Sequence, residues 1–120
     1  MRVLIVDNHA AVRAALTSLL EQVPDIEIVG EADDGKLAVE MARKLHPDVI
    51  LMDVHLPVLD GIEATRLICA ECPGVRVIGI SMYDQGERVQ PMLDAGAVAY
   101  VSKSESPTVL LQAIRRSATK

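Results

Sequence analysis

Aromatic side chains are nearly absent from this sequence. Its 120 residues contain no tryptophan, no phenylalanine and only two tyrosines. Proteins that hold single-stranded nucleic acid stack its bases on aromatic rings, and flavin sites also use such rings. The shortage of these side chains argues against both kinds of binding site.

Positive charge is also scarce. Twelve Lys and Arg residues stand against 17 Asp and Glu residues, which gives a net charge of −5 at pH 7. Surfaces that bind nucleic acid or anionic lipid need a local excess of basic residues. We therefore expect no direct nucleic-acid binding by this domain and no association with a membrane.

Long apolar runs are missing as well. The N-terminal run Val3–Val6 is interrupted by Asp7, and no later run is much longer. A signal peptide or a membrane-spanning helix needs a longer apolar stretch. The sequence therefore predicts a cytoplasmic protein.

Only two cysteines are present, and they form a CxxC pair. Cys69 and Cys72 are followed at once by Pro73 and Gly74, which predict the end of a helix. The helix dipole does not favour a thiolate at that end, and a zinc site would need a second pair of ligands. We interpret the cysteines as structural thiols in a reducing compartment.

Short apolar runs alternate with helical periodicity along the whole chain. The runs cover residues 3–7, 26–32, 49–53, 75–81 and 98–103. Near-continuous apolar strands that alternate with helices are typical of a parallel sheet covered on both faces. We expect one domain, residues 1–120, with a doubly wound α/β fold. Its flavodoxin-like (βα)5 sheet should have five parallel strands in the order 2-1-3-4-5.

Polar residues end four of the five predicted strands. They are Asp7, Asp53, Ser81 and Lys103. The carboxyl ends of parallel strands share one edge, and ligands bind there where the strand order reverses, between the first and third strands. Asp7 and Asp53 should therefore be neighbours.

This set of side chains suits phosphoryl chemistry. Two adjacent carboxylates can bind a hard cation, and one of them can attack phosphorus. The ammonium of Lys103 and the hydroxyl of Ser81 can hold phosphoryl oxygens. Alternatively, the strands simply end in polar residues where they reach water. That explanation suits any one of the four residues better than all of them together.

Four motifs resemble the response-regulator receiver domain of two-component signalling over essentially the whole chain. They are "VLIVDNH", "VILMDVHLPVLDGIEATR", "VIGISMYD" and "GAVAYVSKSES". The overall sequence pattern is most similar to that of receivers that carry a C-terminal helix-turn-helix domain. The resemblance implies a phosphorylation switch rather than an enzyme, one that assists only its own phosphorylation and dephosphorylation.

The resemblance also implies a role for individual residues. Asp53 would accept a phosphoryl group from the phosphohistidine of a sensor histidine kinase. Mg²⁺ or Mn²⁺ would be held by Asp7, Asn8, Asp53 and the backbone carbonyl of His55. The switch and phosphate-binding residues would be Ser81, Lys103 and Tyr100, and the side chains of His55 and Tyr83 would tune the rate of dephosphorylation.

Phosphorylation would then change a partner or dimer interface. The resemblance implies a phosphorylation-dependent homodimer that controls a DNA-binding output domain, which this chain does not contain.

Asn8 departs from the family pattern, which has two adjacent acids at this point. An amide oxygen can coordinate Mg²⁺, but the lost charge should weaken the metal site. Asn8 can also be explained as the N-cap of the first helix. The alternative function is therefore a receiver-like interaction module that is not phosphorylated. Its neighbour His9 is expected to be a solvated loop or helix-start residue.

Enzyme functions fit less well. An aspartyl phosphatase typically has a second acid two residues after its nucleophile, where this chain has His55. A flavodoxin would need a phosphate-binding loop rich in Ser, Thr or Gly after the first strand. This chain has Asn8-His9-Ala10-Ala11 there instead.

Overall fold

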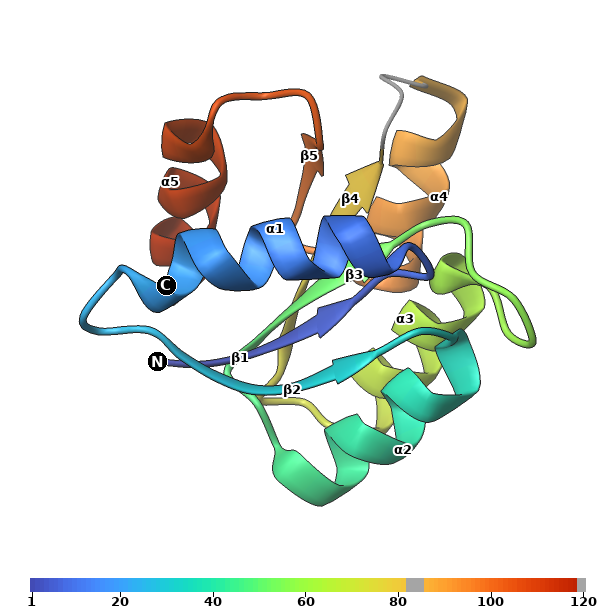
Figure 1. Cartoon of the computed structure of the whole chain (residues 1–120). Coiled ribbons are helices and arrows are strands. Elements are labelled where there is room, and N and C mark those ends of the chain that lie inside the picture. The colour runs from blue at the N-terminus through green and yellow to red at the C-terminus, as the bar shows by residue number, and fades with distance from the viewer. Residues whose placement is uncertain (82–85, 119–120) are drawn as a thin grey trace.

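The computed structural model describes residues 1–81 and 86–118, and its strands alternate with helices (Figure 1). β1 covers Arg2–Val6, α1 Ala10–Glu21, β2 Glu27–Ala32, α2 Gly35–Leu45, β3 Val49–Asp53, α3 Gly61–Glu71, β4 Arg76–Ser81, α4 Gly86–Ala95, β5 Ala99–Ser102 and α5 Pro107–Ala118.

The sheet is parallel, with the predicted strand order β2-β1-β3-β4-β5. β1 and β3 are adjacent, with Val6 opposite Met52 in the register. β3 and β4 are adjacent as well, with Asp53 opposite Ile80. The strand order reverses between β1 and β3, so Asp53 and the residue after Val6 lie at the reversal point. The predicted fold and strand order are confirmed.

Two apolar layers fill the space on either side of the sheet. Leu4, Ile50 and Val77 point to one face and pack with α2, α3 and α4, whereas Ile5 and Leu51 point to the other face and pack with α1 and α5. Figure 1 shows these two groups of helices on opposite sides of the sheet. Because both faces are covered, the central strands β1, β3 and β4 are apolar between their ends, and only their ends carry polar residues.

The start of α3 follows local capping chemistry. The Asp60 carboxylate accepts hydrogen bonds from the backbone N–H groups of Ile62 and Glu63, which satisfies two free donors of α3. Gly61 is needed because a Cβ there would lie 2.0 Å from the carbonyl oxygen of Asp53. The start of α3 therefore packs directly against the end of β3.

The first helix begins one residue later than it would if Asn8 were its N-cap. His9 is the N-cap residue of α1, and its side chain makes no capping hydrogen bond. The N-cap explanation of Asn8 is therefore wrong, because the helix starts one residue later and leaves Asn8 in the connecting loop. The Asn8 residue is exposed there.

Two further expectations concern membranes and cysteines. Among the described residues, none of the helices combines the length and apolar character needed to cross a bilayer. Cys69 and Cys72 are both free thiols, and Cys72 is the C-cap of α3. Burial raises the pKa of the Cys69 thiol. Cys69 is therefore not activated as a nucleophile, in agreement with the structural interpretation.

Candidate functional site

Three charged side chains meet at the carboxyl edge of the sheet. Asp7 follows β1, Asp53 is the last residue of β3, and Lys103 follows β5. The Lys103 ammonium forms an ion pair with Asp7 Oδ2 and lies 3.4 Å from Asp53 Oδ2. The exposed fractions of the three side chains are 0%, 4% and 6%. We call these three residues the charged pocket.

Backbone groups hold both carboxylates in place. The N–H of His55 donates to Asp53 Oδ1 at 3.2 Å, and the N–H of His9 donates to Asp7 Oδ1 at 2.8 Å. Arg13 also donates from its guanidinium to the backbone carbonyl of Asp7 at 2.6 Å. After both β1 and β3 the chain turns directly, so the backbone N–H two residues after Asp7 and Asp53 faces the carboxylate.

Burial and the nearby charges shape the acidity of Asp53. Removal from water raises the pKa of its carboxyl group, and the negative charge of Asp7 raises it further. The ammonium of Lys103 and the N–H of His55 oppose this rise. With all three groups ionised, the charged pocket carries one net negative charge. A buried negative charge of this kind attracts a cation.

The pocket has the donor groups of a divalent cation site. Ligand atoms of Asp7, His9 and Asp53 all lie within 4.8 Å of one another. Carboxylate oxygens are preferred ligands of Mg²⁺, and within the described part of the chain the two buried carboxylates share the ammonium of Lys103. The residues therefore fit a divalent cation. The exposed Asn8 lies between two members of the group in the sequence.

Two neighbours of this pocket were not identified from the sequence. His9 is exposed as expected, but its ring folds back, and Nδ1 lies 3.3 Å from Asp7 Oδ1. Arg13 tethers the backbone of Asp7 and also pairs with Glu31. The only available signal was spacing, since both residues lie within two turns of the predicted strand end.

Ser81 and Tyr100 lie on the β4–β5 side of the site, beside the charged pocket. Ser81 ends β4 and is 1% exposed, and its carbonyl accepts a hydrogen bond of 2.6 Å from the N–H of Lys103. Tyr100 is half-buried in β5 and packs against the layer that contains Met92. Its hydroxyl is buried and has no hydrogen-bond partner among the described residues. Tyr83 lies outside the described residues.

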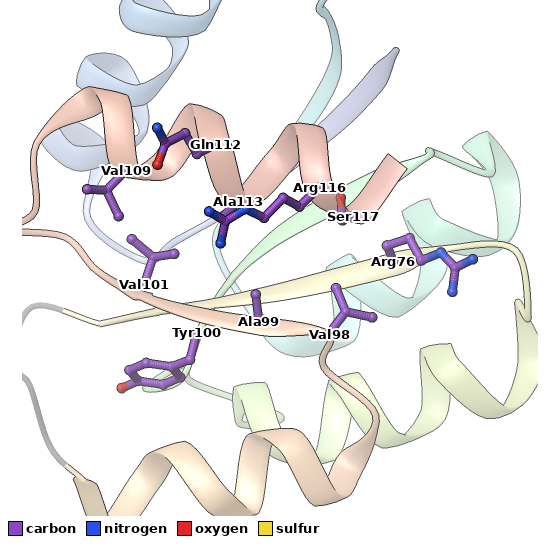
Figure 2. A pocket seen from close by; sticks show the side chains of 10 residues that line it. All are labelled: Arg76, Val98, Ala99, Tyr100, Val101, Val109, Gln112, Ala113, Arg116 and Ser117. Atoms are coloured by element: carbon purple, nitrogen blue, oxygen red, sulfur yellow. The ribbon is translucent and has the colours of Figure 1, made fainter. Parts of the chain in front are cut away.

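A groove of about 470 Å³ runs along β5 beside α5. Figure 2 shows Ala99 and Val101 directed toward α5, while Tyr100 points to the opposite side of the strand. Val98 is 46% exposed and Val109 37% exposed, so the groove is bordered by apolar side chains. Tyr100 itself is among the residues that line this groove.

Comparisons with known proteins agree with this geometry. The model of the response regulator receiver domain family matches residues 3–115. The transcriptional regulatory protein LiaR of Bacillus subtilis is 43% identical over 115 residues, which cover 96% of this chain and 54% of LiaR. The chain therefore spans about half the length of the curated relatives it matches.

Solved structures give the same result. The response regulator domain of Thermotoga maritima CheB aligns with a TM-score of 0.92 and 36% identity, covering 100% of this chain and 97% of that one. A chain of the CheX-CheY-BeF3-Mg²⁺ complex from Borrelia burgdorferi aligns with a TM-score of 0.91 and 27% identity, covering 100% and 90%. This chain belongs to the response regulator receiver domain family, the regulatory phosphoacceptor domains of two-component systems.

Proposed function

We propose that residues 1–120 form one receiver domain in which Asp53 accepts a phosphoryl group from the phosphohistidine of a sensor histidine kinase. One observation carries this proposal: a buried ammonium, that of Lys103, pairs with two buried carboxylates at the reversal point of the sheet. Removing charges from water is costly, so a buried charge cluster of this kind points to a functional role rather than a stabilising one. Phosphoryl transfer is such a role.

The reaction is an in-line displacement at phosphorus. A carboxylate oxygen of Asp53 forms the new bond, the phosphorus–nitrogen bond of the donor breaks, and the imidazole leaves with the electron pair. Lys103 and the N–H of His55 favour the ionised form of Asp53, which is the reactive one. The kinase and the switch would both work in the cytoplasm.

A divalent cation, Mg²⁺ or Mn²⁺, would be held by Asp7, Asn8, Asp53 and the carbonyl of His55. Such a cation neutralises charge that builds up between the carboxylates and the phosphoryl oxygens. The fully buried Asp7 would be one of its ligands, and the chain would exclude water from the buried side of the pocket. His55 and Tyr83 would control how water reaches the phosphoryl group and hence the rate of dephosphorylation.

The new charge on Asp53 would operate the switch. Lys103 and Ser81 gain phosphoryl oxygens as partners, and each charge-assisted hydrogen bond is worth about 1.5–3 kcal/mol. A decisive shift between two conformations needs about 5.5 kcal/mol, so a few such bonds suffice. Lys103 and Tyr100 are close together on β5 and the loop after it, so the movement of one would reposition the other.

The output would be a changed protein interface. The groove along β5 and α5 lies next to Tyr100 and would be remodelled with it (Figure 2). The curated relatives include transcriptional regulators about twice as long as this chain. We therefore propose a phosphorylation-dependent homodimer that controls a DNA-binding output domain, with no nucleic-acid contact by the receiver itself.

Intact-mass spectrometry tests this function. The chain is incubated with acetyl phosphate, with and without Mg²⁺, beside the variant Asp53→Asn. The expected result is one phosphoryl adduct that needs Mg²⁺ and is absent from the variant. No adduct, together with no Mg²⁺ binding by titration calorimetry, would overturn the proposal in favour of an unphosphorylated interaction module.

A further inference from the structure

The His9 side chain lies where a metal ligand would lie. Its Nδ1 is 3.3 Å from Asp7 Oδ1, and a ligand atom of His9 also lies within 4.8 Å of a carboxylate oxygen of Asp53. Two adjacent ligands of an octahedral cation, each about 2.1 Å from it, are about 3 Å apart, and two opposite ligands are about 4.2 Å apart. The Nδ1–Oδ1 separation of 3.3 Å is close to that of two adjacent ligands, so the His9 ring lies near the position of a ligand that shares a cation with Asp7.

The local backbone keeps the ring in this position. The N–H of His9 donates to the same Asp7 oxygen, at 2.8 Å, so the residue is held at both its backbone and its side chain. His9 is the N-cap of α1 but does not use its side chain to cap the helix. The imidazole is therefore free of a structural task at the helix start and faces the pocket.

We propose that the imidazole of His9 is a direct ligand of the divalent cation and shifts the preference of this pocket from Mg²⁺ toward first-row transition cations. The proposal rests on the proposed function, because the same pocket binds the cation. It goes further by naming a ligand on this chain and the class of metal that this ligand favours.

Ligand chemistry supports the preference. Mg²⁺ takes oxygen ligands, whereas an imidazole nitrogen suits Co²⁺, Ni²⁺, Zn²⁺ and similar cations. Asn8 replaces a carboxylate in the family pattern, so the pocket has lost a charged oxygen that would favour Mg²⁺. A nitrogen ligand from the next residue, His9, compensates for this loss only with a cation that accepts nitrogen.

A structural role for His9 is the competing explanation. Its ring would then only orient Asp7 through the contact at 3.3 Å. Removal of the ring would in that case weaken Mg²⁺ and Co²⁺ by the same factor, because both cations would lose the same oriented carboxylate. The ratio of the two affinities therefore separates a ligand from an orienting residue.

The test is calorimetric titration of the whole chain with Co²⁺ and, separately, with Mg²⁺. The variant is His9→Ala, and the matched control is His46→Asn, which removes an exposed imidazole at a left-handed position that asparagine tolerates. Loss of an indirect metal partner already costs about 10- to 100-fold, so loss of a direct ligand should weaken Co²⁺ by at least about tenfold. Mg²⁺ affinity should change much less, and His46→Asn should change neither.

Pulsed electron paramagnetic resonance of bound Mn²⁺ gives a second readout. The expected spectrum shows coupling to an imidazole nitrogen in the parent chain and in His46→Asn, but not in His9→Ala. Equal loss of both affinities, or nitrogen coupling that survives in His9→Ala, would overturn the inference. Phosphorylation that still requires Mg²⁺ would then leave the proposed function standing, whereas absence of the phosphoryl adduct would refute that function separately.

Discussion

The two halves of the site differ in how well their polar groups are satisfied. In the charged pocket, each buried carboxylate has a backbone N–H donor and lies beside the ammonium of Lys103. Asp7 Oδ2 makes no hydrogen bond among the described residues, but it forms an ion pair with that ammonium. Along β4 and β5, by contrast, the buried hydroxyl of Tyr100 has no partner among the described residues. In the charged pocket the charged side chains hold one another in place, whereas the β4–β5 side contains a buried hydroxyl without a hydrogen bond among the described residues.

This difference assigns different tasks to the two halves. A locked pocket keeps its reacting groups in place, which phosphoryl transfer requires. A half with an unsatisfied polar group has a native conformation of higher free energy, so a modest change nearby can shift it. We therefore propose that the chemistry takes place in the charged pocket and that the response is carried by the β4–β5 side.

The largest predicted effect comes from breaking the charged pocket. Lys103→Met leaves two buried carboxylates without their cation, and the free energy of unfolding should fall by about 3–5 kcal/mol at neutral pH. Urea unfolding measures the loss, which should shrink in acid as the carboxylates protonate. The control Lys36→Met removes an exposed lysine of α2 and should change stability by less than about 0.5 kcal/mol. Equal stability of the two variants would contradict the idea of a charge-locked pocket.

A second prediction uses the raised pKa of Asp53. Because the folded chain raises the pKa above its unfolded value, stability is lost as pH rises through the window between the two values. Asp53→Asn should therefore be more stable than the parent chain at neutral pH without metal. The difference should vanish in acid, below the ordinary pKa of about 3.9.

Urea unfolding in a chelating buffer from about pH 4 to pH 8 measures this gain. The control Asp33→Asn removes an exposed carboxylate and should show no comparable trend. Saturating Mg²⁺ should reduce or reverse the gain, because only the parent chain binds the cation tightly. A parent chain that is more stable than Asp53→Asn without metal would contradict this account.

A third prediction concerns the packing under Tyr100. A Cβ at Gly79 would lie 2.9 Å from Met92 Cε and 3.0 Å from Tyr100 Cδ2. Gly79→Ala should therefore overpack the ring and lower the free energy of unfolding by about 1–3 kcal/mol. Gly74→Ala is the control, since no atom lies within 4 Å of its added Cβ. The cost of Gly79→Ala should fall in a Tyr100→Ala background if the tyrosine ring is the obstacle.

The smallest predicted effect is a gain. Tyr100→Phe removes the unpartnered hydroxyl and should raise the free energy of unfolding by about 1 kcal/mol. Thermal and urea unfolding of the two chains measure it. A loss of stability would mean that the hydroxyl has a partner, and the contrast between the two halves would then be wrong.

The fold and the charged pocket could be predicted because they follow from strand geometry. Apolar runs that end in Asp7, Asp53 and Lys103 imply a common edge once the strands are parallel, and the structure brings these residues together. No side-chain conformation had to be known for that inference. The position along the chain was enough.

Other features depend on directions that residue types do not encode. Nothing in the sequence shows that the ring of His9 turns back to Asp7 rather than into solvent. Val58 adopts a left-handed backbone with φ of 69°, although a β-branched residue is poorly suited to that conformation. The lack of a hydrogen-bond partner for the Tyr100 hydroxyl likewise depends on which atoms surround it. Such details arise from the packing of the whole domain.

The central claim is that charge on Asp53 changes the environment of Tyr100. It can be measured most directly by nuclear magnetic resonance of a chain with ¹³C-labelled tyrosine, titrated with beryllofluoride and Mg²⁺. Tyr83→Phe leaves Tyr100 as the only tyrosine, and Asp53→Asn is the negative control. We predict a new Tyr100 ring signal that grows with beryllofluoride and is absent from Asp53→Asn. Binding of beryllofluoride with no change in the Tyr100 signal would contradict the account.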